Sequence, residues 1–87
     1  MEFYLSQIIE MPFSWQMRGA VPCRGQILPI QQYTALFALV GTSFGGDGIH
    51  NFALPDLRPI ENGQRREWTY GETVKHICLE GVFPSRE

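Results

Sequence analysis

The stretch that decides the fold is GTSFGGDGIHNFALPDLR, residues 41–58. Its first eight residues hold four glycines around Phe44, a density that disfavours helix and strand because each glycine loses much conformational freedom on folding. We therefore expect a loop of fixed shape. The dipeptide Asp47-Gly48 predicts a tight turn with positive φ. The side chains of Asp47 and Asn51 are expected to accept hydrogen bonds from backbone amides of the loop.

Two functions of similar loops, phosphate binding and calcium binding, do not fit these residues. A phosphate-binding loop follows a strand and ends in Gly-Lys-Ser/Thr, whereas this loop follows an expected helix and lacks that ending. Asp47, Asn51 and Asp56 carry oxygen atoms suited to calcium, but their spacing is not that of an EF-hand loop. Arg58 is expected to pair with an acid such as Asp56. We interpret the loop as scaffold, and the residues expected to maintain the fold are Gly41, Gly45, Gly46, Asp47, Gly48, Phe52, Leu54, Pro55, Asp56 and Arg58.

The residues before this loop predict the clearest helix of the chain, over 31–40. Tyr33, Leu36, Phe37 and Val40 recur at the spacing i, i+3, i+4 and i+7, which forms one apolar stripe. The glycine that opens the loop can take positive φ and end the helix. A helix of about ten residues is marginal by itself, so we expect the stripe to pack against the strands.

Three other segments predict short strands. Residues 5–11 predict an edge strand, which Pro12 ends because proline cannot donate to a sheet ladder. Residues 21–30 mix β-branched residues with a glycine and two prolines and predict strand, turn and strand. Residues 73–79 alternate and predict a closing strand. Two aromatic residues after the first segment are expected in the core or in an interface: Phe13 and Trp15.

Together these elements predict the α+β class, as a small mixed fold with short β-strands, one central short α-helix and long ordered loops. A single domain is expected over 1–87, with a core (1–58), a shortened excursion (59–75) and a closing strand with a C-terminal tail (76–87). At 44% hydrophobic and 13% aromatic residues the chain can bury a core. Chains this small often need a disulfide, a metal or an oligomer, so self-association is expected.

Charge and hydropathy exclude several classes of function. A net charge of −2 and a single lysine do not provide the basic surface that nucleic-acid binding requires. No apolar run approaches the roughly 20 residues that cross a bilayer, so no membrane span is expected. The N-terminus has an early acid, Glu2, and no basic region followed by an apolar one, so no conventional signal peptide is predicted.

The cysteines and histidines are Cys23, His50, His76 and Cys78, and none of them form a pair with the short spacing of a zinc site. His76 and Cys78 would share one face of a strand, which allows a thiol–imidazole pair for a thiol hydrolase. The alternative is a small buried Cys78 beside His76 at the solvent edge. A disulfide between Cys23 and Cys78 would tie two strands together in an oxidising location, and two free thiols remain the alternative. No acid, base and nucleophile come together, so we expect no enzyme and no cofactor.

The segment 59–72 is polar and is expected to be an exposed excursion, with a turn at Asn62-Gly63. Four of its side chains are the candidate binding surface, because arginine and aromatic residues are the usual anchors of interfaces: Arg65, Arg66, Trp68 and Tyr70. For Trp68 the alternative is a packed side chain that covers the core.

With these residues in view, the sequence resembles the phage tail collar domain of phage tail-fibre proteins and of bacterial microcystin-dependent proteins. The resemblance rests on Cys23, on GQILPI (25–30), on ALFALVGT (35–42), on FGGDG (44–48) and on FALPDLR (52–58). More weakly, Ile8, Trp15 and Arg18-Gly19 resemble the opening strand and turn of the family, although Ser6 and Ala20 stand where the family usually has Gly and Trp. Residues 77–86, ICLEGVFPSR, are similar to the terminal strand of microcystin-dependent proteins.

The resemblance implies a non-enzymatic structural and adhesive subunit of a virion or an extracellular assembly, commonly in threefold fibres. It favours a homo-oligomer, a trimer above all, or contact with other tail or fibre proteins. After Arg58 the family has a long region rich in glycine and histidine, which residues 59–75 replace here. No metal role is therefore carried over, and the chain resembles a shortened, minimal fold. Loss of that region also favours an alternative, a free-standing module that recognises a host protein or a surface glycan.

Overall fold

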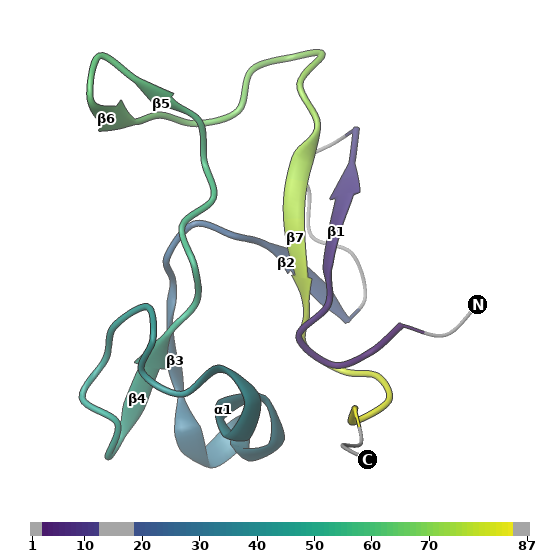
Figure 1. Cartoon of the computed structure of the whole chain (residues 1–87), viewed down its shortest axis with the longest axis vertical. Helices are drawn as coiled ribbons and strands as arrows, with labels where there is room; N and C mark the ends of the chain where they lie inside the picture. The colour runs from purple at the N-terminus through teal and green to yellow at the C-terminus, as the bar shows by residue number, and fades with distance from the viewer. Residues whose placement is uncertain (1–2, 13–18, 85–87) are drawn as a thin grey trace.

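The structure is a computed structural model that describes residues 3–12 and 19–84 (Figure 1). Its elements in chain order are β1 (Ile8–Met11), β2 (Ala20–Pro22), β3 (Ile27–Pro29), the 3₁₀-helix η1 (Ile30–Gln32), α1 (Thr34–Val40), β4 (Asn51–Ala53), β5 (Ile60–Glu61), β6 (Gln64–Arg65) and β7 (Val74–Cys78). The fold is small and mostly β, with short antiparallel strands and the helix α1. No helix in the described ranges is long and apolar enough to cross a membrane. The expected positions of Phe13 and Trp15 lie outside the described residues.

The three-stranded sheet has the order β1-β7-β2, so the last strand of the chain lies between the first two (Figure 1). Ile8 of β1 lies opposite Ile77 of β7, and Val21 of β2 lies opposite the same residue. The prediction of an edge strand that ends at Met11 is confirmed. β1 begins only at Ile8, because Ser6 has a φ of 71°, which an extended strand does not allow.

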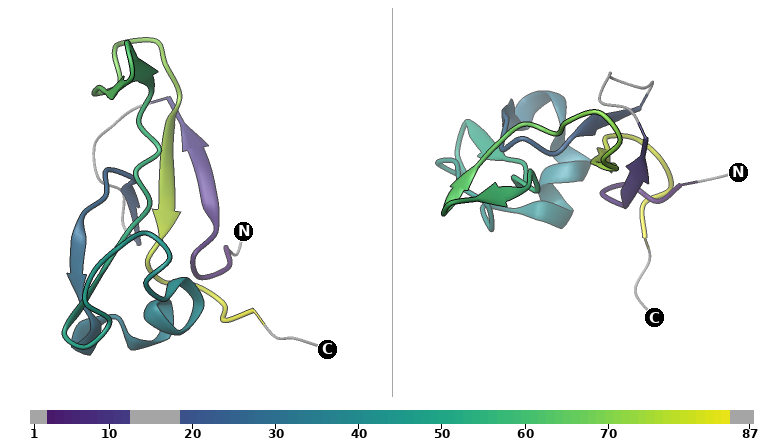
Figure 2. Two further views of the ribbon diagram at one scale, coloured as in Figure 1. Left: turned by 60° about the vertical axis from the view of Figure 1, so that its left-hand side comes forward. Right: turned by 90° about the horizontal axis from the view of Figure 1, so that it is seen from above.

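The main core lies between this sheet, α1 and the β3–β4 pair (Figure 2). The predicted stripe of α1 is confirmed, since Leu36 and Val40 are buried and Tyr33 and Phe37 pack against the core. The helix is shorter than predicted because η1 occupies its expected first turn. Gly41, with a φ of 61°, ends α1 as predicted. The buried core residues are Leu5, Cys23, Leu36, Val40, Phe52, Leu54 and Ile77.

The position of His76 differs from the prediction of a solvent-edge residue, because its exposed fraction is 0%. β7 is a central strand, so His76 has Ile9 on one side and Pro22 on the other. The imidazole Nδ1 lies 3.0 Å from the carbonyl oxygen of Val74. A histidine at the solvent edge would have required β7 to be an edge strand.

Of the two alternatives for Cys23 and Cys78, the disulfide is not formed, and both residues are buried free cysteines. The register explains this difference. Cys78 lies opposite Ala20, whereas the N–H of Cys23 donates to the carbonyl of Lys75 at 2.9 Å. Three residues of extended chain span roughly 10 Å, and bonded cysteines need Cα atoms within about 7 Å. The odd separation also places the two side chains on opposite faces of the sheet, so Cys23 packs with Ile77 in the main core.

Residues 59–73, which we call the arm, form the β5–β6 hairpin and the segment that leads back to β7. Asn62 and Gly63 make the predicted turn, with φ values of 55° and 79°. The arm projects from the end of the molecule opposite α1 (Figures 1 and 2). Within the described residues, β5 and β6 pair only with each other. The arm is therefore not part of the sheets that build the core.

Candidate binding surface

Asp47, the acidic residue in the first half of the glycine-rich loop, forms its hydrogen bonds within the loop. One carboxylate oxygen of Asp47, Oδ1, accepts three hydrogen bonds from backbone N–H groups. The donors are Ile49, His50 and Asn51, at 2.8, 2.8 and 3.0 Å. The N–H of Asp47 in turn donates to Asn51 Oδ1 at 2.9 Å. These hydrogen bonds hold the pKa of Asp47 well below its usual range. The predicted Asx-type bonding is confirmed, and the carboxylate serves the loop backbone.

Apolar burial fixes the same loop to the core. Phe52 is fully buried, and its ring lies 5.3 Å from that of Phe37, with 56° between the ring planes. Gly46, at a φ of 94°, lies so close to Phe52 that a Cβ atom would overlap the Phe52 backbone. The chain therefore needs glycine here for both conformation and space. The loop is therefore closely packed against the core at this point.

Arg58 connects the end of the loop to the arm. Its Nε and Nη2 donate to the two carboxylate oxygens of Asp56 at 2.9 and 2.8 Å, and Nη1 donates to Glu67 Oε2 at 3.0 Å. The predicted pair between Arg58 and Asp56 is confirmed, and it lowers the pKa of Asp56. The second acid, Glu67, was not among the predicted partners.

Arg66 holds the arm together from the inside. Its guanidinium donates to both carboxylate oxygens of Glu72 at 2.9 and 2.8 Å, and to Glu61 Oε2 at 2.8 Å. Hydrogen bonds from Arg66 and from the N–H of Thr69 lower the pKa of Glu72 to about 2. Arg66 was predicted as a binding residue, but its hydrogen bonds are used to join the two ends of the arm.

The arm contacts the core through charged groups and one aromatic ring. Arg24 Nε donates to Glu67 Oε1 at 2.8 Å, and its guanidinium carbon lies 5.5 Å from the centre of the Trp68 ring. Arg65 Nη1 donates to the carbonyl oxygen of Arg58 at 2.6 Å. Trp68 is half-buried against Arg24 and is not a member of the apolar core. The alternative prediction, a packed Trp68 side chain that covers the core, is therefore correct in part.

The four predicted binding residues thus have different environments. Arg65, Arg66 and Trp68 contact other parts of the chain, whereas Tyr70 is fully exposed, at 107%. The structure adds two residues that the sequence did not suggest, Arg24 and Glu67. They are 43 positions apart, and no local pattern indicates that they meet.

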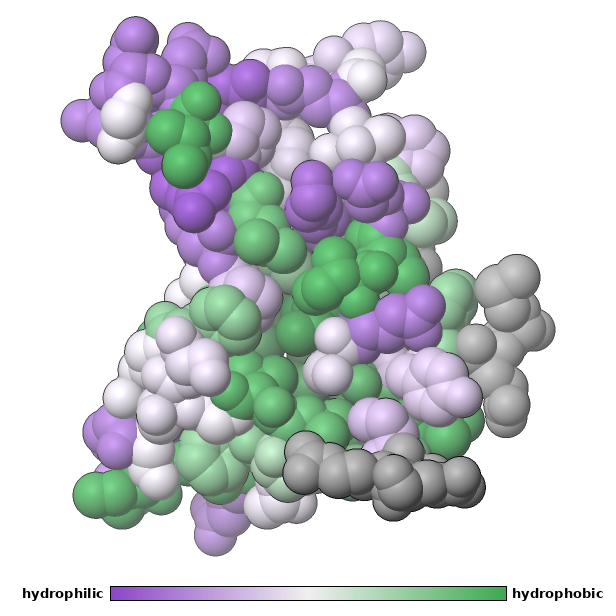
Figure 3. Space-filling view, viewed as in Figure 1, coloured by the Kyte–Doolittle hydropathy of each residue, from purple (hydrophilic) through white to green (hydrophobic). Residues whose placement is uncertain are grey.

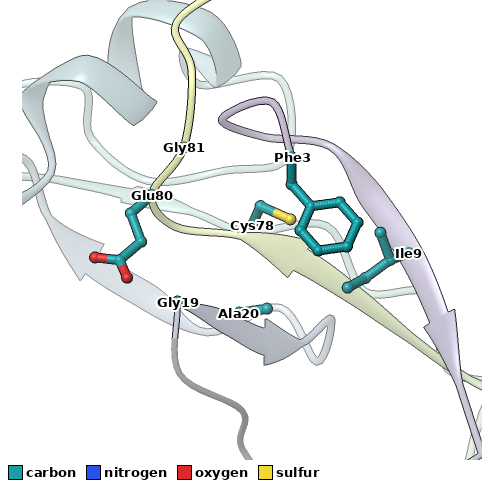
Figure 4. Close-up of a pocket in the computed structure, with 7 residues that line it drawn as sticks. All are labelled: Phe3, Ile9, Gly19, Ala20, Cys78, Glu80 and Gly81. Carbon is teal, nitrogen blue, oxygen red and sulfur yellow. The ribbon is translucent and has the colours of Figure 1, made fainter. Parts of the chain in front are cut away.

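The two cysteines lack the environment of a nucleophile. Burial, together with the charge of Asp56, raises the pKa of Cys23 to about 12, and burial also raises the pKa of Cys78. Cys78 lines a cavity of about 270 Å³ together with Phe3 and Ile9 (Figure 4). The Glu80 carboxylate at its rim points away from the sulfur. Among the described residues, no group of three or more histidine, cysteine, aspartate or glutamate side chains is arranged to hold a metal.

A second surface feature is an apolar groove of about 460 Å³ between α1, β1 and the end of the glycine-rich loop. Ile8, Leu39, Phe44 and Leu57 line it, and Phe44 is 53% exposed. Figure 3 shows hydrophobic residues gathered across the middle of this face, below the hydrophilic arm. Further exposed apolar residues come from the two terminal segments, which a bridge between Tyr4 and Val82 joins: Phe3, Tyr4, Val82 and Phe83.

Comparison with known proteins supports the sequence-based resemblance. The family model described as Phage Tail Collar Domain matches residues 6–60, which include β1 to β4 and the whole glycine-rich loop. Most of the arm, β7 and the segment similar to microcystin-dependent proteins lie outside the match, so that last similarity stays a prediction. Neither the curated proteins nor the solved structures give a significant match.

Proposed function

The chain belongs to the phage tail collar domain family, and from this membership we propose that it is a non-enzymatic structural and adhesive subunit that associates with copies of itself. The family is a virion-associated one with a structural role in tails and fibres. The assembly that we propose is a phage tail or a tail-fibre-like assembly, and the oligomer that the resemblance favours is a trimer.

The observation that carries self-association is the apolar groove beside α1 together with its exposed rim. Ile8 and Phe44 are 42% and 53% exposed at the groove. Contiguous exposed apolar surface on a small domain is typical of an interface. A chain of this length also gains stability when an oligomer buries such surface.

Light scattering over a range of concentrations tests this proposal. We expect the mass to approach that of three chains as the concentration rises. Phe44→Lys places a charge at the groove and should weaken association at least about tenfold, because the charge would have to be desolvated on binding. Ile49→Lys is the matched control, since Ile49 lies on the same loop, is 75% exposed and lines no part of the groove. A strict monomer at high concentration would disprove self-association.

The arm is the adhesive surface that we propose, with Tyr70 as its outward anchor. Arg66 fixes the shape of the arm from within, and Arg65 and Trp68 fix it to the core. These three predicted residues would then support the surface, while Tyr70 and Ile60, both largely exposed, would contact the partner. Tyrosine is a common anchor because it offers a large contact area at a small cost in entropy.

A second candidate function is a free-standing module that recognises a host protein or a surface glycan. The fully exposed Tyr70 on an internally braced arm favours it, because such a site needs no second copy of the chain. Co-purification from a host lysate, followed by direct binding of the purified partner, separates the two functions. Tyr70→Ala should remove that binding, whereas Tyr4→Ala, which changes an exposed tyrosine at the opposite end, should not. Binding that survives Tyr70→Ala would rule out the arm as the recognition surface.

A further inference from the structure

The arm and the core meet at a carboxylate held by two arginines. Glu67 of the arm places Oε1 at 2.8 Å from Arg24 Nε and Oε2 at 3.0 Å from Arg58 Nη1. Both carboxylate oxygens are therefore bound, each by a guanidinium from a different segment of the core. We call these three residues the latch. Its hydrogen bonds are charge-assisted, the stronger kind in proteins.

On the core side of the latch, the Arg58 side chain and the Arg24 backbone are held by contacts that do not involve Glu67. Asp56 holds Arg58 through two side-chain hydrogen bonds. The backbone of Arg24 is fixed by a β-bridge to Asp56 and by a hydrogen bond from its N–H to Gln26 Oε1 at 2.9 Å. The Arg58 guanidinium is thus preorganised for a carboxylate, with Arg24 on a fixed backbone beside it, and the acid that binds there need not come from the same chain.

The arm side of the latch is equally self-contained. Arg66 binds Glu61 and Glu72, which lie near the two ends of the arm, and the β5–β6 hairpin pairs within itself. In the described part of the chain no strand of the arm pairs with a strand of the core. An arm with its own bracing can leave one core and dock on another as a rigid unit, which is the condition for exchange between copies.

The ligand that fits this site is an acid followed by an aromatic residue on an extended segment. Glu67 enters between the arginines and Trp68 packs on Arg24. A second copy of the chain carries the same segment, so its arm is complementary to the site in charge and in sequence.

We propose that copies of this chain exchange arms, so that Glu67 of one copy docks on Arg24 and Arg58 of the next. Exchange keeps every latch contact and only changes which copy supplies the acid, so it costs little free energy. The contact is head-to-tail, and it closes into a ring when the rotation between copies matches the symmetry. This inference rests on the proposed self-association and names the contact that would join the copies.

Mixing two variants tests the exchange. Glu67→Arg removes the acid but leaves the arginine site intact, and Arg24→Glu disrupts the site but leaves the acid intact. Neither variant can form a complete latch within one chain. A mixture can form one between chains, because the intact arm of one variant meets the intact site of the other. Light scattering and native mass spectrometry measure the association of each variant and of the equimolar mixture.

We expect each variant alone to associate about tenfold more weakly than the wild-type chain, since like charges replace an attractive pair. The mixture should return to within about threefold of the wild type. A mixture no tighter than its components would overturn arm exchange and leave self-association standing. Single variants that associate as tightly as the wild type would also overturn arm exchange and leave self-association standing. A wild-type chain that never associates would overturn both proposals.

Two controls keep the result interpretable. Glu80→Lys reverses an exposed charge at the cavity beside Phe3, beyond the end of β7 that is remote from the arm, and should leave association unchanged. The double variant Arg24→Glu/Glu67→Arg restores an opposite pair within one chain and should recover association alone. The side chains of Arg24 and Glu67 are 34% and 56% exposed, so circular dichroism should show that all variants fold.

Discussion

The glycine-rich loop and the arm adjoin each other in the chain, yet different forces give them their shapes. The loop is held by buried Phe52 and Leu54 and by backbone hydrogen bonds such as that from the N–H of Ala53 to the carbonyl of Gly45 at 3.1 Å. The arm, at residues 59–73, is held by ion pairs and exposes most of its side chains.

This difference has consequences for how each region responds to its surroundings. Apolar burial does not depend on the ionisation of acids and is not weakened by charge screening, whereas ion pairs between partly exposed side chains weaken at high salt and when the acids are protonated. The loop should therefore behave as permanent scaffold. The arm should behave as a docked element whose attachment depends on conditions. Each prediction below tests one side of that contrast.

Truncation of the loop anchor should have the largest effect. Phe52→Ala removes a fully buried ring and should lower the free energy of unfolding by about 3–5 kcal/mol, through lost burial and the cavity left behind. Ile60→Ala on the arm, where the side chain is 63% exposed, should change it by less than about 0.5 kcal/mol. Urea unfolding followed by circular dichroism measures both. Equal effects would contradict the contrast between loop and arm.

Two glycines with the same backbone angle sharpen the comparison. Gly46 in the loop and Gly71 in the arm both have a φ of 94°, but only Gly46 has backbone atoms where a Cβ would lie. Gly71→Ala should therefore cost only the conformational strain, about 1–2 kcal/mol. Gly46→Ala should cost about 2–4 kcal/mol, because the overlap with Phe52 adds to that strain. Thermal and urea unfolding compare them, and similar costs would show that the loop is not closely packed.

Much of the local structure could be predicted because its causes are local. The stripe from Tyr33 to Val40, the positive φ at Gly48 and the Asn62-Gly63 turn each depend on residues within a few positions of one another, and the structure has all three. Arg58 lies two positions from Asp56, so their ion pair was also within reach of sequence reasoning.

The long-range pairings could not be predicted in the same way. Nothing near Val74 indicates that β7 will lie between β1 and β2, because that order depends on pairing with residues more than 50 positions away. The expected burial of Cys78 is confirmed, but the prediction of a solvent-edge His76 and the disulfide alternative for Cys78 were wrong for this reason. The burial of a side chain and the face of the sheet on which it lies follow from the strand order and register. The contact between Arg24 and Glu67 was missed because only the folded chain brings them together.

Acid should loosen the arm and weaken its attachment to the core while the loop keeps its shape. The pKa of Glu72 is lowered from 4.5 to about 2, and that of Glu67 is also lowered. A lowered pKa means that the ion pairs stabilise the folded arm fully above pH 4.5 and lose this effect as the pH falls toward 2. Amide NMR signals of residues 59–73 should therefore shift over that interval before those of 41–58.

High salt at neutral pH should reproduce the effect of acid in part, since about 1 M salt shortens the screening length to about 3 Å. The pKa of Asp47 lies well below its usual range, so the loop keeps its own carboxylate ionised through most of the same titration. Loop and arm signals that move together would show that the two regions form one cooperative unit and would remove the basis for a detachable arm.

The smallest expected effect separates the two aromatic residues of the arm. Trp68→Ala removes the ring beneath Arg24 and should lower the free energy of unfolding by about 0.5–1 kcal/mol, the range of cation–π contacts at exposed sites. Tyr70→Ala should leave stability unchanged, because the side chain of Tyr70 is fully exposed. Urea unfolding measures both, with the amide signal of Arg24 as a local probe that only Trp68→Ala should shift. If Tyr70→Ala were the more destabilising change, Tyr70 would be part of the packed arm and no longer an anchor left free for a partner.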